Sequence, residues 1–424
     1  MSNRKIINKR KKQLQRKIIT LFFIVIALII SIFIITHNNN QPQEVSNNES
    51  INAANNVNEN IFEAKEKEDS IKTYKAKLIA GGDALLHGQI LTAANNPETG
   101  TNDFSHMLSL IKDEVSQYDI KYYNQEVIFD DDKPYTGYPT FNAPSAWGKN
   151  MVEDLGFNLV SLATNHSMDG GINSAKKSAA WWESHENIIA TGMASSEEKS
   201  KEHKIMEANG IKYAMLAYTY GTNGIPVTED YVVNIFDKEK ALEDIKLIRD
   251  KVDVLIVAMH WGAEYNTGIT DVQKEQAKFL GENGVDIILG NHTHCIEPWE
   301  WIDEDTIVFY AFGNLISNQI TAESAITRKL GPIGYLGSLE ITKTVDTENN
   351  TSKIKIDNIG ADLIYTYRYY NNEKGKYDYL IVPFSKMESK YLSDYQSVYD
   401  EFSSILKTFD ENITIAPLPD NDSN

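Results

Sequence analysis

Runs of apolar residues that end in polar side chains recur through the middle of the chain. Between them, spaced apolar positions predict helices. Buried parallel strands read as nearly continuous apolar runs, and four such runs are predicted as strands: Lys77–Ala80, Leu159–Ala163, Val254–Met259 and Val285–Leu289. The helices are predicted over Ser145–Leu155, Ile172–His185, Lys238–Lys251 and Asp271–Asn283. Alternating strands and helices indicate an α/β domain, in which ligands bind beyond the carboxyl ends of the strands.

The pattern changes after residue 300. Thr306–Phe312, Gly334–Thr344 and Lys353–Leu363 are predicted as strands without intervening helices, which indicates an antiparallel or mixed sheet. A helix is predicted over Lys390–Phe409. We therefore expect a main domain over residues 74–345, a strand and helix extension packed on it over 346–412, and a disordered tail over 413–424.

The N-terminal region has its own pattern. Ile18–Thr36 is a run of 19 residues without charge, and a membrane-spanning helix needs about 20 apolar residues. Eight Lys or Arg side chains and no acidic ones lie in residues 1–17, so the positive-inside rule places the N-terminus in the cytoplasm and the main domain outside the cell. We expect an uncleaved single-pass anchor, the alternative being a cleaved signal peptide, which usually has a shorter apolar core. Residues 37–72, rich in Asn, Glu and Ser, are expected to be a disordered linker.

Charge and cysteine content exclude some ligands and one kind of cross-link. Beyond residue 36 the chain carries 33 basic and 60 acidic side chains. A domain this acidic is not expected to bind nucleic acid, and it should repel polyanions except at a local metal or basic site. Cys295 is the only cysteine, so no intrachain disulfide can form.

Four of the nine histidines directly follow predicted strands: His166, His260, His292 and His294. His292 and His294 are two residues apart, so their imidazoles can grip one metal ion or face two adjacent ones. Asp83 and Glu126 add carboxylate oxygens and Asn165 a carbonyl oxygen. A mixed oxygen and nitrogen set without thiolate is more typical of a catalytic metal site than of a structural one.

Several short motifs occur together and in order. They are Gly82-Asp83-Ala84-Leu85-Leu86, Asn124-Gln125-Glu126, Ala163 to Gly171, His260-Trp261-Gly262-Ala263-Glu264, Gly290-Asn291-His292-Thr293-His294 and Tyr310 to Leu315. On these motifs the sequence resembles the CapA-type poly-γ-glutamate capsule-synthesis family, which is similar in fold to calcineurin-like metallophosphatases. The resemblance implies a metallophosphatase-like α/β/β/α sandwich and spans about residues 78–319.

The resemblance also implies a two-metal site. Asp83 and His294 would bind the first ion, Glu126 would bridge, and Asn165, His260 and His292 would bind the second. The ions would be divalent, with Mn, Fe or Zn as candidates. His166 would protonate a leaving oxygen or steady a substrate anion.

The sequence departs from the phosphatase pattern at the first strand. That pattern has Asp-x-His, whereas the residue two after Asp83 is Leu85. His87 is a possible substitute, and Glu126 stands where phosphatases usually have Asp. Glu264 and Asn314 are further candidates, Glu264 as a pocket residue and Asn314 either as a residue that orients the site or as part of a tight bend. For Asp169 a structural role in the turn is the preferred interpretation.

Three functions stay open at this point. The first is a cell-surface protein for the synthesis, export or retention of poly-γ-glutamate, working beside membrane-bound synthase and transport subunits. The second is an extracellular metal-dependent hydrolase of phosphoesters or of cell-envelope amides or esters. The third is a non-catalytic scaffold that keeps the fold with a degenerate metal site. Because the domain is acidic, bound divalent cations are the expected means of offsetting its charge toward the polymer. Resemblance alone does not separate them.

Overall fold

The computed structural model describes residues 70–419, and a single compact unit begins at Ile71. The predicted membrane helix, Ile18–Thr36, and almost all of the predicted linker lie outside the described residues. Within residues 70–419, none of the helices has the length and apolar character needed to cross a bilayer.

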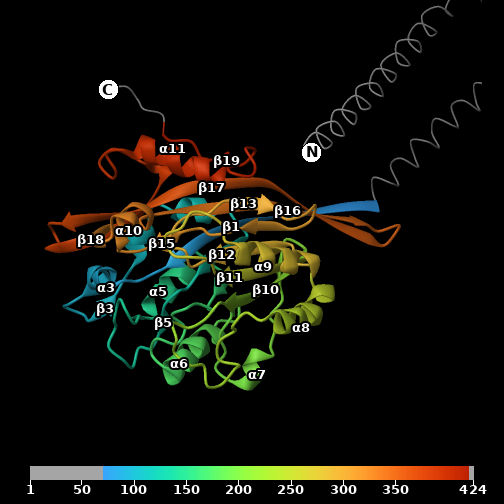
Figure 1. The fold of residues 1–424 in the computed structure, drawn as a ribbon, viewed down its shortest axis with the longest axis horizontal. Coiled ribbons are helices and arrows are strands. Elements are labelled where there is room, and N and C mark those ends of the chain that lie inside the picture. Colours follow the sequence, from blue (N-terminus) through green and yellow to red (C-terminus); the bar gives the residue numbers. More distant parts are fainter. Residues whose placement is uncertain (1–69, 420–424) are drawn as a thin grey trace, which may run out of the picture. The chain divides into compact units, whose positions relative to one another are not determined.

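The fold is mixed α/β and contains two large sheets (Figure 1). The larger has nine strands in the order β18-β17-β16-β1-β4-β7-β8, with β15 beside β1 and β19 beside β17. Its strands are β1 Ile71–Ala84, β4 Ile120–Asn124, β7 Leu159–Ser161, β8 Ile189–Thr191, β15 Asn314–Ile316, β16 Ile333–Asp346, β17 Thr351–Asn371, β18 Lys376–Pro383 and β19 Thr414–Ile415.

The smaller sheet has six strands in the order β13-β14-β12-β11-β10-β9. They are β9 Met206–Ala208, β10 Ile211–Thr219, β11 Val254–His260, β12 Ile287–Asn291, β13 Trp299–Trp301 and β14 Ile307–Phe309. Two short ladders complete the strands: β2 Asn95–Asn96 with β3 Thr101–Asn102, and β5 Ile128–Phe129 with β6 Asn142–Ala143.

The helices are short and connect the strands. They are α3 Gly88–Ala94, α4 Lys112–Val115, α5 Ala146–Lys149, α6 Ile172–Glu183, α7 Glu197–Ser200, α8 Lys238–Ile248, α9 Asp271–Glu282, α10 Ala325–Leu330 and α11 Tyr395–Leu406. The predicted helix Ser145–Leu155 divides into α5 and a π-helical turn over Asn150–Asp154. The helices predicted from Ile172, Lys238 and Asp271 are confirmed as α6, α8 and α9.

Three hydrophobic clusters hold the sheets and helices together as layers. One lies between the two sheets, where Leu78 and Tyr122 belong to the same cluster as Ile256 and Ile287. The second joins the other face of the larger sheet to α3, α5 and α6, and the third joins the smaller sheet to α8 and α9. Strands such as β11 are therefore buried along their whole length, which explains their unbroken apolar sequence.

Of the three late strands, Gly334–Thr344 and Lys353–Leu363 confirm the expected antiparallel or mixed sheet, as parts of β16 and β17. Thr306–Phe312 instead gives β14, which pairs parallel with β12 in the smaller sheet, and the helix α10 intervenes before β16. β16, β17 and β18 pair antiparallel, and β16 also pairs antiparallel with β1. On the other side of β1, β4, β7 and β8 continue the sheet in parallel. Residues 346–412 thus supply two strands of the larger sheet, and α11 lies beside β17 (Figure 1).

The carboxyl ends of the parallel strands in both sheets lie close together. β1, β4 and β7 end at Ala84, Asn124 and Ser161, and β11 and β12 end at His260 and Asn291. Gly82 lets β15 approach β1 closely, because a Cβ atom there would lie 1.8 Å from the Gly313 carbonyl oxygen. The Asp83 amide then donates to that oxygen over 2.9 Å, which fixes Asp83 at the convergence of the strands.

One buried acid should control the stability of this fold at alkaline pH. Glu297 is fully buried, and burial raises the pKa of its carboxyl from 4.5 to about 8. Between these values the folded protein holds a proton that the unfolded chain has lost, so stability should fall as pH rises. The slope for one such group is at most about 1.4 kcal/mol per pH unit. We expect Glu297→Gln to be more stable than the wild type at pH 8 and nearly equal to it at pH 4.5.

Denaturant unfolding from pH 4.5 to 9 in the presence of chelator measures this. Glu304→Gln, at an exposed position, serves as the control and should follow the wild-type curve. Parallel curves for Glu297→Gln and wild type would contradict the assignment.

Candidate metal centre

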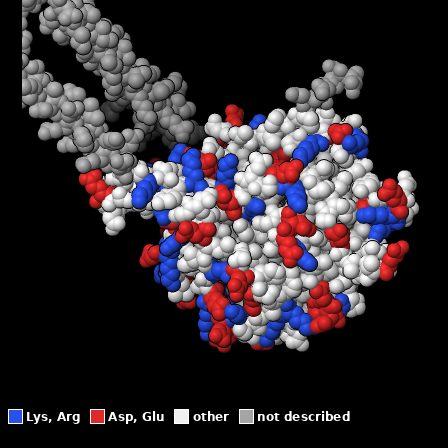
Figure 2. Space-filling model, turned by 180° about the vertical axis from the view of Figure 1, so that it is seen from behind, with Lys and Arg blue, Asp and Glu red and all other residues white. Residues whose placement is uncertain are grey.

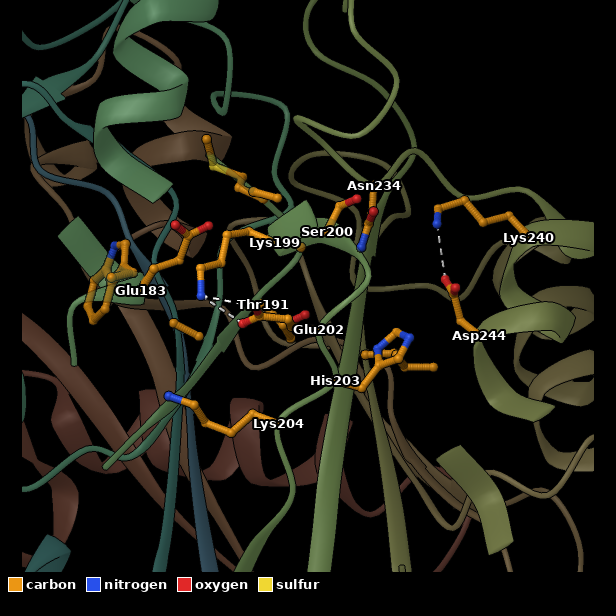
Figure 3. A pocket seen from close by; sticks show the side chains of 16 residues that line it. Glu183, Thr191, Lys199, Ser200, Glu202, His203, Lys204, Asn234, Lys240 and Asp244 are labelled. Atoms are coloured by element: carbon orange, nitrogen blue, oxygen red, sulfur yellow. Dashed lines mark hydrogen bonds and ion pairs between the residues drawn. The ribbon is translucent and has the colours of Figure 1, made fainter. Parts of the chain in front are cut away.

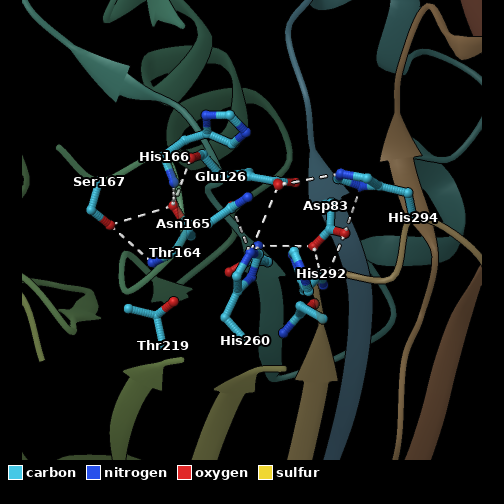
Figure 4. A network of polar contacts seen from close by, with 12 residues as sticks. Asp83, Glu126, Thr164, Asn165, His166, Ser167, Thr219, His260, His292 and His294 are labelled. Carbon is cyan, nitrogen blue, oxygen red and sulfur yellow. Dashed lines mark hydrogen bonds and ion pairs between the residues drawn. The ribbon is translucent and has the colours of Figure 1, made fainter. Parts of the chain in front are cut away.

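Six predicted donors meet at the carboxyl ends of the strands (Figure 4). Asp83 is the second-last residue of β1, Glu126 follows β4, Asn165 follows β7, His260 ends β11, and His292 and His294 follow β12. Each of these residues is buried. Side chains separated by up to 211 positions in sequence are thus placed together by the two sheets.

Glu126 is common to two donor groups. Ligand atoms of Asp83, Glu126 and His294 lie within 4.8 Å of one another, and so do those of Glu126, His260 and His292. Among residues 70–419 these are the groups of His, Cys, Asp and Glu that could hold a metal ion. A carboxylate that belongs to both groups has the position of a bridging ligand.

The Glu126 carboxylate lacks a hydrogen-bond donor. Neither of its oxygens has a hydrogen-bond partner among the described residues, and the side chain is fully buried. A buried carboxylate without hydrogen bonds is costly. Burial raises the pKa of Glu126 well above its usual value, and Asp83 adds to this, while His294, whose Nε2 atom lies 3.6 Å from Oε1, acts in the opposite direction. Divalent cations between the two groups would satisfy both oxygens, so the residues present fit a two-metal site.

The histidines divide into two kinds. Burial lowers the pKa of His260 far below its usual value and that of His292 to about 3, so both imidazoles are neutral. Burial also acts against the charge of His294, but Glu126 and Asp83 together raise its pKa to about 10. A proton on His294 therefore occupies the position where a cation is electrostatically favoured, and metal binding would displace it.

The turn after β12 is strained. His292 has φ 98° and His294 has φ 53°, conformations that cost non-glycine residues about 1–3 kcal/mol each. The His292 amide donates to the Asp83 carboxylate over 3.1 Å. Of the two alternatives from the sequence, this backbone gives the second: each imidazole belongs to a different donor group.

Asn165 and His166 occupy the β7 side of the site. The Asn165 Oδ1 atom lies 3.0 Å from His260 Nε2, next to the second donor group. The His166 Nδ1 atom lies 2.7 Å from the Asp169 carboxylate, which also accepts from the Phe141 amide over 2.6 Å. The preferred interpretation of Asp169, a structural role in the turn, is incomplete, because its carboxylate also contacts the imidazole of His166.

Three further candidates lie around the donors. His87 joins neither donor group; its Nδ1 atom lies 3.2 Å from the Asn318 amide and 3.0 Å from the Leu85 carbonyl. Asn314 contacts His294, with 3.1 Å between Oδ1 and Nδ1. Glu264 also joins neither group and is exposed at the rim.

Asn124, which the sequence singled out only as part of a motif, contacts two of the donors. Its Nδ2 atom donates to Asp83 over 2.9 Å and lies 3.4 Å from His260 Nδ1, so it spans the two sheets. Its position two residues before Glu126, at a strand end, was the available signal, because alternate strand residues share a face.

A separate polar pocket, away from these donors, lies near β8, α7 and α8 (Figure 3). Two of its lysines are already paired: Lys199 with Glu202 at 2.8 Å and Lys240 with Asp244 at 3.3 Å. None of the six donors lines this pocket.

Comparison with known proteins identifies relatives over the same region. The family model described as "Bacterial capsule synthesis protein PGA_cap" matches residues 77–319, which include all six donors. The PGA biosynthesis protein CapA of Bacillus subtilis is 26% identical over 215 residues, which cover 49% of this chain and 56% of that protein. The capsule biosynthesis protein CapA of Bacillus anthracis is 27% identical over 175 residues, 40% of this chain and 42% of that protein. The chain thus matches about half the length of these relatives.

Solved structures give a weaker likeness. A phosphatase from Mycoplasma pneumoniae has a TM-score of 0.39 at 15% identity, covering 68% of this chain and 94% of that one. A calcineurin-like phosphoesterase from Bacillus subtilis has a TM-score of 0.35 at 15% identity, covering 68% and 91%. TM-scores this low support no statement about activity or ligand. The family model, by contrast, matches more than half of the chain, which therefore belongs to the bacterial capsule synthesis protein PGA_cap family.

Proposed function

We propose that this chain is a membrane-anchored, cell-surface protein of poly-γ-glutamate capsule biogenesis, acting in synthesis, export or retention of the polymer. The observation that carries the proposal is the family match over residues 77–319, which contains the complete donor set. The charge-free run Ile18–Thr36 behind a basic segment supports the anchor and the extracellular domain. Membrane-bound synthase and transport subunits are its proposed partners.

The metal centre is the proposed contact with an anionic polymer. On the face shown in Figure 2, acidic and basic side chains are interspersed and leave no broad basic area. Because the chain as a whole is acidic, local cations are the means by which it would hold carboxylates. Asp83, Glu126 and His294 would hold one ion, and Glu126, Asn165, His260 and His292 the other, within a metallophosphatase-like α/β/β/α sandwich. Mn, Fe and Zn suit this oxygen and nitrogen donor set.

A second candidate, metal-dependent hydrolysis of phosphoesters or of cell-envelope amides or esters, is favoured by the contact between His166 and Asp169. When bound, the ions would supply Lewis-acid activation of a phosphoryl or acyl group. Asp169 accepts from Nδ1 of His166, which leaves Nε2 to hold the proton that a leaving oxygen needs. Leu85, buried where the phosphatase pattern has a ligand, is the feature that favours a scaffold instead.

Metal content tests the centre directly. We expect elemental analysis of the purified chain to find about two divalent ions per molecule. Glu126→Ala should lose both ions, because both groups use this carboxylate, whereas Asp83→Ala should lose mainly one. Glu282→Gln, at an exposed site on α9, is the control. A wild-type chain that folds without bound metal would contradict the two-metal centre and favour the non-catalytic scaffold.

Complementation of a deletion strain tests the role in the capsule. Cells with the wild-type chain should retain poly-γ-glutamate, measured as cell-associated polymer, whereas cells with Glu126→Ala should not. Immunoblotting of membranes verifies that both chains are present in equal amounts. Full retention by the variant would show that the capsule role does not need the metal centre.

Turnover of a generic aryl phosphate tests hydrolysis. Asp169→Asn removes the charge that orients His166, so kcat should fall about 10²-fold or more with little change in KM. The metal content should stay at the wild-type level, because Asp169 is in neither donor group. Unchanged turnover in Asp169→Asn would exclude His166 as the proton donor.

A further inference from the structure

The loop after β11 places an unpaired carboxylate at the rim of the metal centre. Gly262 and Tyr265 have φ 89° and 57°, and the Tyr265 amide donates to the Thr293 carbonyl over 2.7 Å. This bond fastens the loop to the turn that holds His292 and His294. Glu264, the residue before Tyr265, is exposed, and within residues 70–419 its carboxylate has no hydrogen-bond or ion-pair partner.

Aromatic rings lie close to three of the site histidines. The Tyr220 ring lies 4.7 Å from that of His292 and the Tyr265 ring 5.9 Å from that of His294, measured between centroids. On another side, Tyr138 is 79% exposed and packs against Phe141, whose ring lies 4.8 Å from His166. The rim therefore combines tyrosine faces with one free carboxylate.

Basic side chains take little part in this rim. Burial and then Glu264 raise the pKa of both Tyr220 and Tyr265. The groups that act most strongly on Glu126, His294 and these two tyrosines include no Lys or Arg of the described chain. A carboxylate among aromatic faces attracts a cation and repels a second anion.

We infer that Glu264 recognises a protonated amine of the ligand while the metal centre holds an adjacent anionic group. This inference rests on the proposed function, and it makes that function more specific. In a γ-linked glutamate chain, each α-nitrogen except the first is part of an amide. A free ammonium therefore exists only at the amino-terminal end, beside the α-carboxylate of the same residue. The site thus selects the amino end of the polymer over its interior.

Matched oligomers test this selection. A γ-glutamyl hexamer with a free amino end and the same hexamer N-acetylated are titrated, by calorimetry, into the full chain loaded with Mn²⁺. The wild type should bind the free-amine oligomer about tenfold more tightly, a difference of about 1.4 kcal/mol. Glu264→Gln should bind both oligomers with the affinity that the wild type has for the acetylated one, and Glu264→Lys should reverse the preference and bind the acetylated form more tightly. Glu282→Gln should behave as the wild type.

The outcomes distinguish amino-end recognition by Glu264 from the capsule role itself. Equal wild-type binding of both oligomers would overturn amino-end recognition and leave the capsule role intact, as would a preference that survives in Glu264→Gln. Failure of the wild type to bind either oligomer would overturn both the polymer ligand and Glu264 recognition of it. Because Glu264 is exposed, its variants should fold normally, which their unfolding curves verify.

Discussion

The burial of the Glu126 carboxylate without a hydrogen-bond donor is the constraint on which the site depends. A charge in this position is tolerated only if it is neutralised or bound by cations. Asp83 cannot help, because it has the same sign and raises the pKa of Glu126 further. The histidines from the smaller sheet then acquire distinct states around it: His260 and His292 stay neutral, and His294 takes up charge.

The donors around Glu126 meet only because two sheets pack against each other. Neither sheet alone contains a complete donor set: the larger one supplies Asp83, Glu126 and Asn165, and the smaller one the three histidines. The inter-sheet cluster holds the two sheets together, and Asn124 contacts both, through Asp83 and His260. Loss of packing between the sheets would therefore separate the donors even with each sheet intact. The strained backbone at His292 and His294 is a local cost that this packing sustains.

Much of this could be predicted from sequence, for a physical reason. Strands buried on both faces have unbroken apolar runs, so their ends, and the polar residues at those ends, are visible in the pattern. This is why Asp83, His260 and His292 could be singled out together. The antiparallel half of β1 could not be recognised, because Ile71–Lys77 alternates with lysines and its pairing with β16 joins residues more than 260 positions apart. β10, although apolar, is not followed by a motif and is not among the predicted strands.

Side-chain contacts across loops were beyond the sequence for another reason. Asp169 looked like a turn residue because Gly170 and Gly171 follow it, and only the fold shows that its carboxylate accepts from both His166 and the Phe141 amide. Tyr220 is at a rim created by a loop whose course depends on the opposite sheet. Periodicity predicts which face a residue occupies, but not which distant residue meets it there.

The two donor groups are chemically unequal, and this inequality bears on what the family fold can do. The first group has two carboxylates and one imidazole, and the buried Leu85 adds nothing where the phosphatase pattern has a histidine. The second has one carboxylate, two neutral imidazoles and the nearby Asn165 oxygen. Harder ligands with fewer nitrogen atoms favour ions such as Mn over Zn, so the first ion should be the more readily exchanged.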